Sequence, residues 1–333
     1  MNEERAMAPK ISVCIPTYNY AHYIPFAVES VLNQQFTDFE LIIVDDCSKD
    51  NTEEVVSRFL YDKRVLFEKN ERNLGLVCNW NKCLSKSRGE YIKFVLADDM
   101  LASDEALGRM AGILDSDPSI SLVASARYFI DSESRIIEIK SRFPAGFIAD
   151  GPEVIKRCLN LLANPIGEPT AVMFRRADCA RGFDERYQHL VDMEMWFHLL
   201  EKGRFAFIAE PLASFRIHPG QKTKENVAQL VHFDDQYLLL KGYLGKSYLP
   251  ISSIMKFYRV FDKLYWLRKS GKKGVITREE ATRRILKHCS YLQFYCYYSM
   301  YKLMRLLFRI RKKINRRKDG ESDQDHGLDW IKH

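Results

Sequence analysis

Short apolar runs alternate with helical patterns through the first 125 residues, and this order limits the fold more than any other feature of the chain. The runs predict strands at 11–16, 39–44, 65–69, 91–97 and 120–126. Strand–helix alternation at this spacing indicates right-handed β–α–β units. The sequence therefore predicts an α/β fold with a mixed, mostly parallel sheet flanked by helices.

The pattern changes after residue 126. A hairpin is predicted over 127–140, and beyond residue 224 the apolar spacing is helical almost throughout. A chain of 333 residues is long enough for about two units. We predict four parts, which are an N-terminal tail at 1–9, an α/β domain at 10–222, a helical region at 223–320 and a flexible tail at 321–333.

The net charge of +7 is unevenly divided along the chain. Residues 1–250 carry 30 Lys and Arg against 36 Asp and Glu, whereas residues 251–333 carry 21 against 8. An acidic body argues against a surface that coats nucleic acid, so no nucleic-acid partner is expected. The basic C-terminal part instead predicts an anionic partner of its own.

Three features predict a cytoplasmic protein. Residues 1–10 lack the apolar region of a secretory signal. The uncharged stretch 289–301 has 13 residues, fewer than the ~18–20 needed to span a bilayer. None of the eight cysteines forms a CxxC pair, and we expect reduced thiols.

Polar residues follow the predicted strands where an open α/β sheet binds its ligands. Thr17 follows the first strand, Asp45 and Asp46 the second, and Asp98 and Asp99 the fourth. Like charges at one sheet edge repel, and a divalent cation such as Mg²⁺ or Mn²⁺ relieves the repulsion. The sequence has no GxGxxG after the first strand and no GxxxxGK[ST], which argues against a dinucleotide dehydrogenase and a P-loop NTPase.

Three segments of the chain resemble family 2 glycosyltransferases of the GT-A fold. They are ISVCIPTYNYAHYIPFAVESVLNQQFTDFELIIVDDCSKDNT, RNLGLVCNWNKCLSKSRGEYIKFVLADD and the stretch from GFDERY to FRIH. The resemblance covers about residues 10–220 and implies that this part is the catalytic domain. Such enzymes bind a nucleotide-sugar, usually a UDP-sugar, and transfer the sugar with inversion.

The resemblance implies a set of donor-binding residues. They are Pro16, Thr17, Tyr18, Asp46, Asn73, Gly75 and Asp98. Tyr18 would stack on the nucleobase, and Asp46 would accept a hydrogen bond from the base N3–H. Cys47 stands where the family usually has glycine.

The resemblance also implies a metal site for Mn²⁺ or Mg²⁺. Asp99 and His218 would be its ligands, and Asp98 would contact the ribose or the metal. Leu96 stands where the common form of the motif has a further acid. Arg216 either faces the core or lies near phosphate.

The general base is expected to be a carboxylate at the start of a helix. Alignment on Trp196 places Asp192 at the position of the family's base, with Val191 in place of the usual preceding acid. Glu194 is the secondary candidate. Residues two apart on a regular helix point in different directions, so Asp192 and Glu194 cannot both point at one site.

Residues 289–318 combine an aromatic first half with nine Lys or Arg from Lys302 to Lys318. The apolar residues that recur at helical spacing are Leu303, Leu306, Leu307 and Ile310. Aromatic and basic residues on an amphipathic helix are typical of a membrane-surface helix, which predicts peripheral association with anionic lipid at the inner face of the cytoplasmic membrane. Two alternatives stay open, namely a helix packed on the protein and a homo-oligomer formed through the C-terminal helices.

The predicted function is metal-dependent, inverting transfer of a hexosyl group from a nucleotide-sugar to a saccharide or a polyprenyl-diphosphate-linked acceptor in bacterial surface polysaccharide synthesis. A nucleotidyltransferase is an alternative, but it usually needs a glycine-rich, basic phosphate loop, and residues 17–25 contain no Gly, Lys or Arg. A non-catalytic nucleotide-sugar-binding protein is a second alternative, suggested by Leu96 and Val191.

Overall fold

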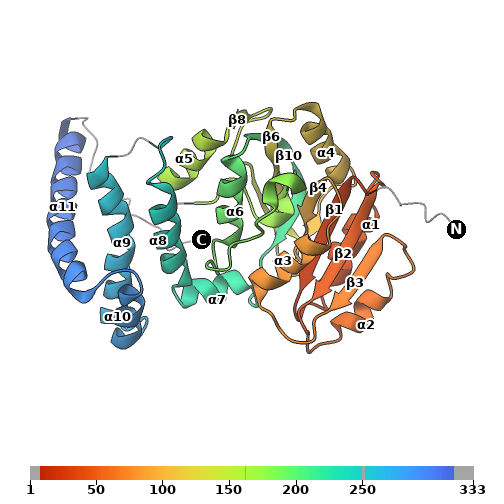
Figure 1. Cartoon of the computed structure of the whole chain (residues 1–333), viewed down its shortest axis with the longest axis horizontal. Helices are drawn as coiled ribbons and strands as arrows, with labels where there is room; N and C mark the ends of the chain where they lie inside the picture. Colours follow the sequence, from red (N-terminus) through yellow and green to blue (C-terminus); the bar gives the residue numbers. More distant parts are fainter. Residues whose placement is uncertain (1–7, 162, 250–251, 319–333) are drawn as a thin grey trace. The chain divides into compact units, whose positions relative to one another are not determined.

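The computed structural model describes residues 8–161, 163–249 and 252–318, with side chains described as far as Leu307 (Figure 1). The chain divides into two compact units, Met1–Asp235 and Gln236–His333. The predicted tail at 321–333, and residues 1–7 of the predicted tail at 1–9, lie outside the described residues.

Within its described residues, the first unit is built on a ten-stranded sheet. The strands are β1 (Ile11–Thr17), β2 (Phe39–Asp45), β3 (Val65–Lys69), β4 (Tyr91–Phe94), β5 (Met100–Leu101), β6 (Ile120–Ile130), β7 (Ile136–Lys140), β8 (Ile148–Asp150), β9 (Val172–Arg175) and β10 (Arg204–Arg216). The order is β3-β2-β1-β4-β9-β6-β10-β5, with β7 beside β6 and β8 beside β10. The hairpin predicted over 127–140 is formed by β6 and β7, which pair antiparallel.

Parallel pairing dominates the part of the sheet whose strand ends carry most of the predicted donor-binding residues. Strands β3, β2, β1 and β4 are all parallel, as are β6 and β10. Strand β9 lies between β4 and β6 and is antiparallel to both. The predicted mixed, mostly parallel α/β sheet is therefore confirmed, and the carboxyl ends of β1, β2 and β4 meet at one edge.

Helices cover both faces of this sheet (Figure 1). Those of the first unit are α1 (Ile24–Leu32), α2 (Thr52–Ser57), α3 (Leu76–Lys86), α4 (Ala106–Ser116), α5 (Gly151–Leu161), α6 (Val191–Leu200) and α7 (Lys222–Ala228), with short 3₁₀ turns at Pro169–Ala171 and Arg176–Cys179. Ile11, Val13 and Ile15 share a core cluster with residues of α1 and α4. On the opposite face, the Trp80 ring of α3 lies 5.7 Å from that of Phe94. Successive residues of β1 point to opposite faces of the sheet, and both faces are covered by helices. All of β1 is therefore buried.

The strand predicted over 91–97 is shorter in the structure, where β4 ends at Phe94. The Leu96 N–H donates to Oγ1 of Thr170 at 3.1 Å instead of continuing the strand ladder. The chain then re-enters the sheet as β5, which pairs antiparallel with β10. Asp98 and Asp99 lie in the turn between β4 and β5, and β10 borders this turn.

Gly89 allows α3 and β1 to approach closely, and its replacement is expected to destabilise the fold. Its N–H donates to Oγ of Ser12 at 2.8 Å, and an added Cβ would lie 2.7 Å from the carbonyl carbon of Ile11. Overpacking of this kind costs about 1–3 kcal/mol, so Gly89→Ala should lower the denaturant midpoint in urea unfolding. Gly112→Ala is the matched control, since nothing lies within 4 Å of its added Cβ. Replacing that helical glycine should raise stability by about 0.4–1 kcal/mol, and equal effects at the two positions would contradict the packing argument.

The second unit is helical in its described residues. Helix α8 (Val231–Tyr243) crosses the boundary, and α9 (Ser253–Lys272), α10 (Arg278–Leu286) and α11 (Tyr291–Lys318) follow. Its core cluster includes Tyr237, Phe261, Ile285, Phe294 and Tyr301. In the described part of the chain, we find no helix with the length and apolarity needed to cross a membrane.

Candidate functional site

The loops that follow β1 and β2 are hydrogen-bonded to each other. The Asn19 N–H donates to Oγ of Ser48 at 2.8 Å, and Oδ1 of Asn19 accepts from the Lys49 N–H at 2.7 Å. Asn19 has φ 59°, a left-handed conformation that asparagine tolerates. These contacts hold Tyr18 with 41% of its side chain exposed.

Pro16 and Thr17 are the last two residues of β1, and both are buried. They directly precede Tyr18 in the sequence. Oγ1 of Thr17 is shielded from solvent and has no hydrogen-bond partner among the described residues. A buried hydroxyl of this kind normally has a partner. The first strand therefore ends in an unsatisfied polar atom next to an exposed aromatic ring.

Asp46 organises the loop that leads into α3. Its Oδ1 accepts from the Leu74 N–H at 2.7 Å, and its Oδ2 accepts from the Gly75 N–H at 2.9 Å. Nδ2 of Asn73 donates to the Asp46 carbonyl at 3.2 Å. Gly75 has φ +85°, which glycine adopts without strain. The structure thus brings together Asp46, Asn73 and Gly75, three of the residues predicted to bind the donor.

Asp45, the first acid of the pair, has a different role. It is fully buried and accepts from the Ser48 N–H at 3.2 Å. Burial raises the pKa of Asp45 above its usual range, and the Ser48 hydrogen bonds oppose that shift. Asp45 therefore stabilises the turn after β2, a role for which the sequence analysis made no prediction.

Asp98 is paired with His218. Its Oδ2 lies 3.1 Å from Nε2 of His218, and both side chains are largely buried. The His218 ring packs against Tyr20 and Tyr23, with centroids 5.8 and 5.0 Å away. A segment that follows β10 and the turn after β4 thus meet in one carboxylate–imidazole contact.

Asp99 is directed away from this contact. Its Oδ2 accepts from Oγ1 of Thr170 at 2.6 Å, and its Oδ1 accepts from the Arg216 N–H at 3.0 Å. The side chain is fully buried, and this burial, with the nearby charge of Asp98, holds the pKa of Asp99 well above its usual range. The two predicted metal ligands, Asp99 and His218, therefore have different partners in the structure.

Arg216 faces the core, which answers the question left open by the sequence. Its Nε donates to the Asp98 carbonyl at 2.8 Å, and its Nη1 donates to the Asp131 carbonyl at 3.0 Å and to Oγ of Ser134 at 2.9 Å. The guanidinium lies 4.8 Å from the centre of the Tyr23 ring. Arg216 thus ties the Asp98 turn to the β6–β7 hairpin.

We tested whether these residues fit a divalent cation. Within residues 8–161, 163–249 and 252–318, no three His, Cys, Asp or Glu side chains are placed to hold a metal ion. Asp98 and His218 nevertheless put a carboxylate, which suits Mn²⁺, beside an imidazole, which is a common metal ligand. A cation that takes its other ligands from substrate phosphates and water fits such a pair.

Asp192 lies in the first turn of α6 and is partly exposed. Its Oδ2 accepts from Nδ2 of Asn164 at 3.0 Å, and its Oδ1 accepts from the Met193 N–H at 2.7 Å. Loss of hydration raises the pKa of Asp192 to about 7, and the neighbouring Glu168 adds to the shift. A carboxylate with a pKa near neutrality is suited to accept a proton.

Glu194, the secondary candidate, has a structural partner. Its two carboxylate oxygens accept from Nη2 of Arg181 at 2.8 and 2.6 Å. Asp192 and Glu194 thus contact different residues, in line with their separation on α6. The ion pair favours Asp192 over Glu194 as the base.

Two residues that support Asp192 carry no motif in the sequence. Asn164 comes from the loop after α5, and Oδ2 of Asp235 accepts from the N–H groups of Gln188, His189 and Leu190 at 2.9, 2.6 and 2.9 Å. Asp235 therefore fixes the segment that enters α6. Trp196, used above to align the sequence, donates from Nε1 to the Gly167 carbonyl at 3.0 Å.

A known protein family and individual known proteins are similar to this chain in sequence. The model of the family described as Glycosyl transferase family 2 matches residues 12–183. An uncharacterized protein of Mycobacterium tuberculosis is 35% identical over 270 residues, covering 78% of this chain and 82% of that protein. The putative teichuronic acid biosynthesis glycosyltransferase TuaG of Bacillus subtilis is 28% identical, covering 63% of this chain and 79% of its own length.

Solved structures share the fold. S. aureus TarS 1–349 in complex with UDP-GlcNAc matches with a TM-score of 0.62 and 19% identity, covering 84% of this chain and 79% of that one. The mannosyltransferase PcManGT from Pyrobaculum calidifontis, in complex with GDP-Man and Mn²⁺, matches with a TM-score of 0.52 and 16% identity, covering 91% and 86%. These likenesses confirm the GT-A fold. Because the family model also spans more than half of the sequence, the chain belongs to glycosyl transferase family 2 and is a glycosyltransferase.

Proposed function

We propose that this enzyme transfers a sugar with inversion from a nucleotide-sugar, preferentially a UDP-sugar, to a saccharide or lipid-linked acceptor, with a divalent cation bound. The observation that supports this most is the segment 164–170. Asn164 holds the carboxylate of Asp192, and Thr170 holds that of Asp99. A segment of this length spans at most about 20–25 Å. This one short segment therefore contacts both the proposed base and the acidic turn.

The donor site is proposed at the ends of β1 and β2. Tyr18 is exposed and free to stack on a nucleobase. Each oxygen of a carboxylate has about two acceptor positions, and Oδ2 of Asp46 uses one of them on Gly75. A base N3–H can therefore bind Asp46 without breaking the loop at Asn73 and Gly75. The TarS structure with UDP-GlcNAc supports a UDP-sugar on this fold.

Asp98 and His218 are the residues we propose to hold the cation, with Asp99 orienting their turn. The resemblance implied Asp99 as the metal ligand and Asp98 as a contact of the ribose or the metal. We assign the metal to Asp98 because Asp99 is buried on Thr170 and the Arg216 N–H. When bound, Mn²⁺ or Mg²⁺ would supply Lewis-acid stabilisation of the departing diphosphate. The Pyrobaculum mannosyltransferase was solved with Mn²⁺, which supports this choice of ion.

Asp192 is the proposed general base. Its carboxylate would remove the proton of the acceptor hydroxyl as that oxygen attacks the anomeric carbon from the face opposite the diphosphate. A single displacement of this kind inverts the configuration at that carbon. Asn164 donates to Oδ2 of Asp192 and so orients the carboxylate.

The pH dependence of transfer should report Asp192. Because its pKa is about 7, the carboxyl is increasingly protonated below pH 7 and cannot accept a proton. We expect kcat/KM to fall with a slope approaching tenfold per pH unit below that point. Asn164→Ala removes a hydrogen-bond donor to the charged form of Asp192. The pKa of Asp192 should therefore rise, and the acidic limb of the profile, where kcat/KM falls, should move to higher pH. An acidic limb near pH 4–5 in the wild-type enzyme would contradict the assignment.

The reaction itself is tested by incubating the protein with a panel of UDP- and GDP-sugars and measuring the nucleoside diphosphate released. Release that requires Mn²⁺ or Mg²⁺ and stops with EDTA supports the proposal. Release that EDTA leaves unchanged would contradict the metal requirement.

The family match already favours glycosyl transfer over nucleotidyl transfer and over a non-catalytic role. The name of the TuaG relative supports a role in bacterial surface polysaccharide synthesis.

Helix α11 supports a proposed location at the inner face of the cytoplasmic membrane. Leu303, Leu306 and Leu307 are each more than half exposed on it, and Lys and Arg are frequent in the sequence from 302 to 318. Ile310 and the basic side chains from Arg309 to Lys318 lie outside the described side chains. Apolar and basic groups on one helix bind anionic lipid surfaces.

Replacing Leu303, Leu306 and Leu307 together by Ser should release the protein from phosphatidylglycerol vesicles in a sedimentation assay. Ile254→Ser, at an exposed residue of α9, is the control. If the triple variant stays bound but changes from dimer to monomer in size-exclusion chromatography, the leucines instead form the oligomer contact that the sequence left open.

A further inference from the structure

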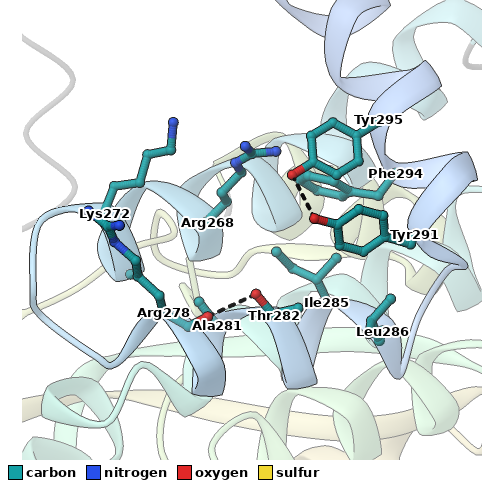
Figure 2. Close-up of a pocket in the computed structure, with 11 residues that line it drawn as sticks. Arg268, Lys272, Arg278, Ala281, Thr282, Ile285, Leu286, Tyr291, Phe294 and Tyr295 are labelled. Atoms are coloured by element: carbon teal, nitrogen blue, oxygen red, sulfur yellow. Dashed lines mark hydrogen bonds between the residues drawn. The ribbon is translucent and has the colours of Figure 1, made fainter.

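A cavity of about 550 Å³ lies inside the second unit, among α9, α10 and α11 (Figure 2). Figure 2 shows Arg268 and Lys272 projecting from α9 on one side, with Tyr291 and Tyr295 of α11 across from them. Arg278 comes from the start of α10. The cavity belongs to the second unit alone and is distinct from the proposed catalytic site.

Three cations line this cavity, and no acidic residue does. Among the described residues, Arg268, Lys272 and Arg278 form no ion pair, and two of the acids on α9 and α10 have other partners. Glu280 is paired with Arg283 at 2.6 Å, and Asp262 accepts from the hydroxyl of Tyr301. Positive charge gathered without a counter-charge predicts an anionic ligand.

Arg268 is held in place with one nitrogen unsatisfied. Its guanidinium lies 4.7 Å from the centre of the Tyr295 ring and 4.6 Å from that of Tyr298. Its Nη1 is shielded from solvent and has no hydrogen-bond partner in the described part of the chain. A buried charged donor without an acceptor is unfavourable, and the side chain that carries it lines the cavity.

The remainder of the wall is mostly apolar, with the hydroxyls of Thr282, Tyr291 and Tyr295 as its polar groups. Ile285, Leu286 and Phe294 line it, and the hydroxyls of Tyr291 and Tyr295 hydrogen-bond to each other at 3.1 Å. The side chains of Ile285, Leu286 and Phe294 contain no polar atom. They suit an alkyl or isoprenoid chain, which gains free energy when its surface leaves water.

We propose that this cavity binds a phosphate group carried by an apolar chain. Arg268 would donate to the phosphate oxygens, with Lys272 and Arg278 at the exposed rim, because guanidinium groups match phosphate geometry and ammonium groups add point charge. Two sources share this chemistry, an isoprenoid phosphate and the headgroup of an anionic phospholipid. An isoprenoid phosphate would carry the lipid-linked acceptor proposed above, but the site itself does not depend on the assignments of Asp98, Asp192 or the donor loop.

The full-length protein is titrated calorimetrically with farnesyl diphosphate and with sodium diphosphate, and its binding to vesicles of phosphatidylglycerol or phosphatidylcholine is measured by sedimentation. The variants are Arg268→Gln and Lys272→Gln. Lys272 is exposed, so its replacement leaves the packing of α9 intact even if Arg268→Gln alters it. Lys256→Gln is the control, because Lys256 lies on the same helix about 18 Å from Arg268 and about 24 Å from Lys272 at 1.5 Å per residue.

We expect each cavity variant to bind the apolar phosphate at least about tenfold more weakly, or about 1.4 kcal/mol, with Lys256→Gln unchanged. This pattern with farnesyl diphosphate identifies an isoprenoid phosphate, and the same pattern with phosphatidylglycerol vesicles alone identifies a phospholipid headgroup. Equal binding by the wild type and both cavity variants, or no binding of either probe, overturns the proposal. Sodium diphosphate that binds as tightly as farnesyl diphosphate overturns its apolar part.

Discussion

Asp192→Asn should lower kcat about 10²- to 10⁴-fold, the range that a positioned general base contributes, and leave the affinity for the donor unchanged. The amide keeps the shape of the side chain, and its one oxygen can accept from either Nδ2 of Asn164 or the Met193 N–H, so we expect only a modest loss of stability at the start of α6. It cannot take the proton of the acceptor hydroxyl. Single-turnover transfer and calorimetric titration with UDP separate the loss in chemistry from donor binding.

Glu194→Gln is the matched control, two residues along the same helix. It weakens the ion pair with Arg181, and we expect a lower melting temperature. Its pH profile should keep the limb near 7, whereas the residual activity of Asp192→Asn should lose it. Turnover of Asp192→Asn within tenfold of the wild type, or a lost limb in Glu194→Gln, would transfer the role of base away from Asp192.

Asp98→Asn should lower kcat/KM about 10²- to 10³-fold, the scale seen when one group that stabilises developing charge is removed, and should abolish stimulation by Mn²⁺. The physical reason is the loss of an anionic ligand beside Nε2 of His218. Activity is measured across a range of Mn²⁺ concentrations, and Mn²⁺ binding is followed by electron paramagnetic resonance.

Asp99→Asn distinguishes the two neighbouring acids. An asparagine there can still accept from the Arg216 N–H and can donate to Oγ1 of Thr170. We therefore expect Mn²⁺ stimulation to persist in Asp99→Asn, with only a change in thermal stability. If Asp99→Asn loses the stimulation and Asp98→Asn retains it, the metal ligand is Asp99, as the family motif implies.

The fold was predictable where local pattern and burial agree. The apolar runs of β1 and β2 are buried along their whole length, so composition alone identifies them. The end of β4 was not predictable, because the bond from Leu96 to Thr170 joins residues far apart in the sequence. Strand β5 was missed for a related reason, since two residues carry no periodicity and β5 exists through pairing with β10.

The candidate site divides in the same way. Motifs identified Asp46, Asn73 and Gly75, and the structure brings them together. Asp235 was missed because its contribution is three accepted N–H groups from a loop more than forty residues earlier. Arg216 was ambiguous because a motif does not state which face of β10 a side chain occupies.

The bonds from Asp46 to the 73–75 loop have a consequence for experiment. The amide protons of Leu74 and Gly75 point at the two oxygens of one carboxylate. Any ligand that draws on that carboxylate changes the electron density around both protons. In an isotope-labelled sample, the ¹H–¹⁵N resonance of Gly75 should shift on titration with a nucleotide even when no sugar is transferred. The loop thus supplies an intrinsic spectroscopic signal by which nucleotides can be ranked before any acceptor is known.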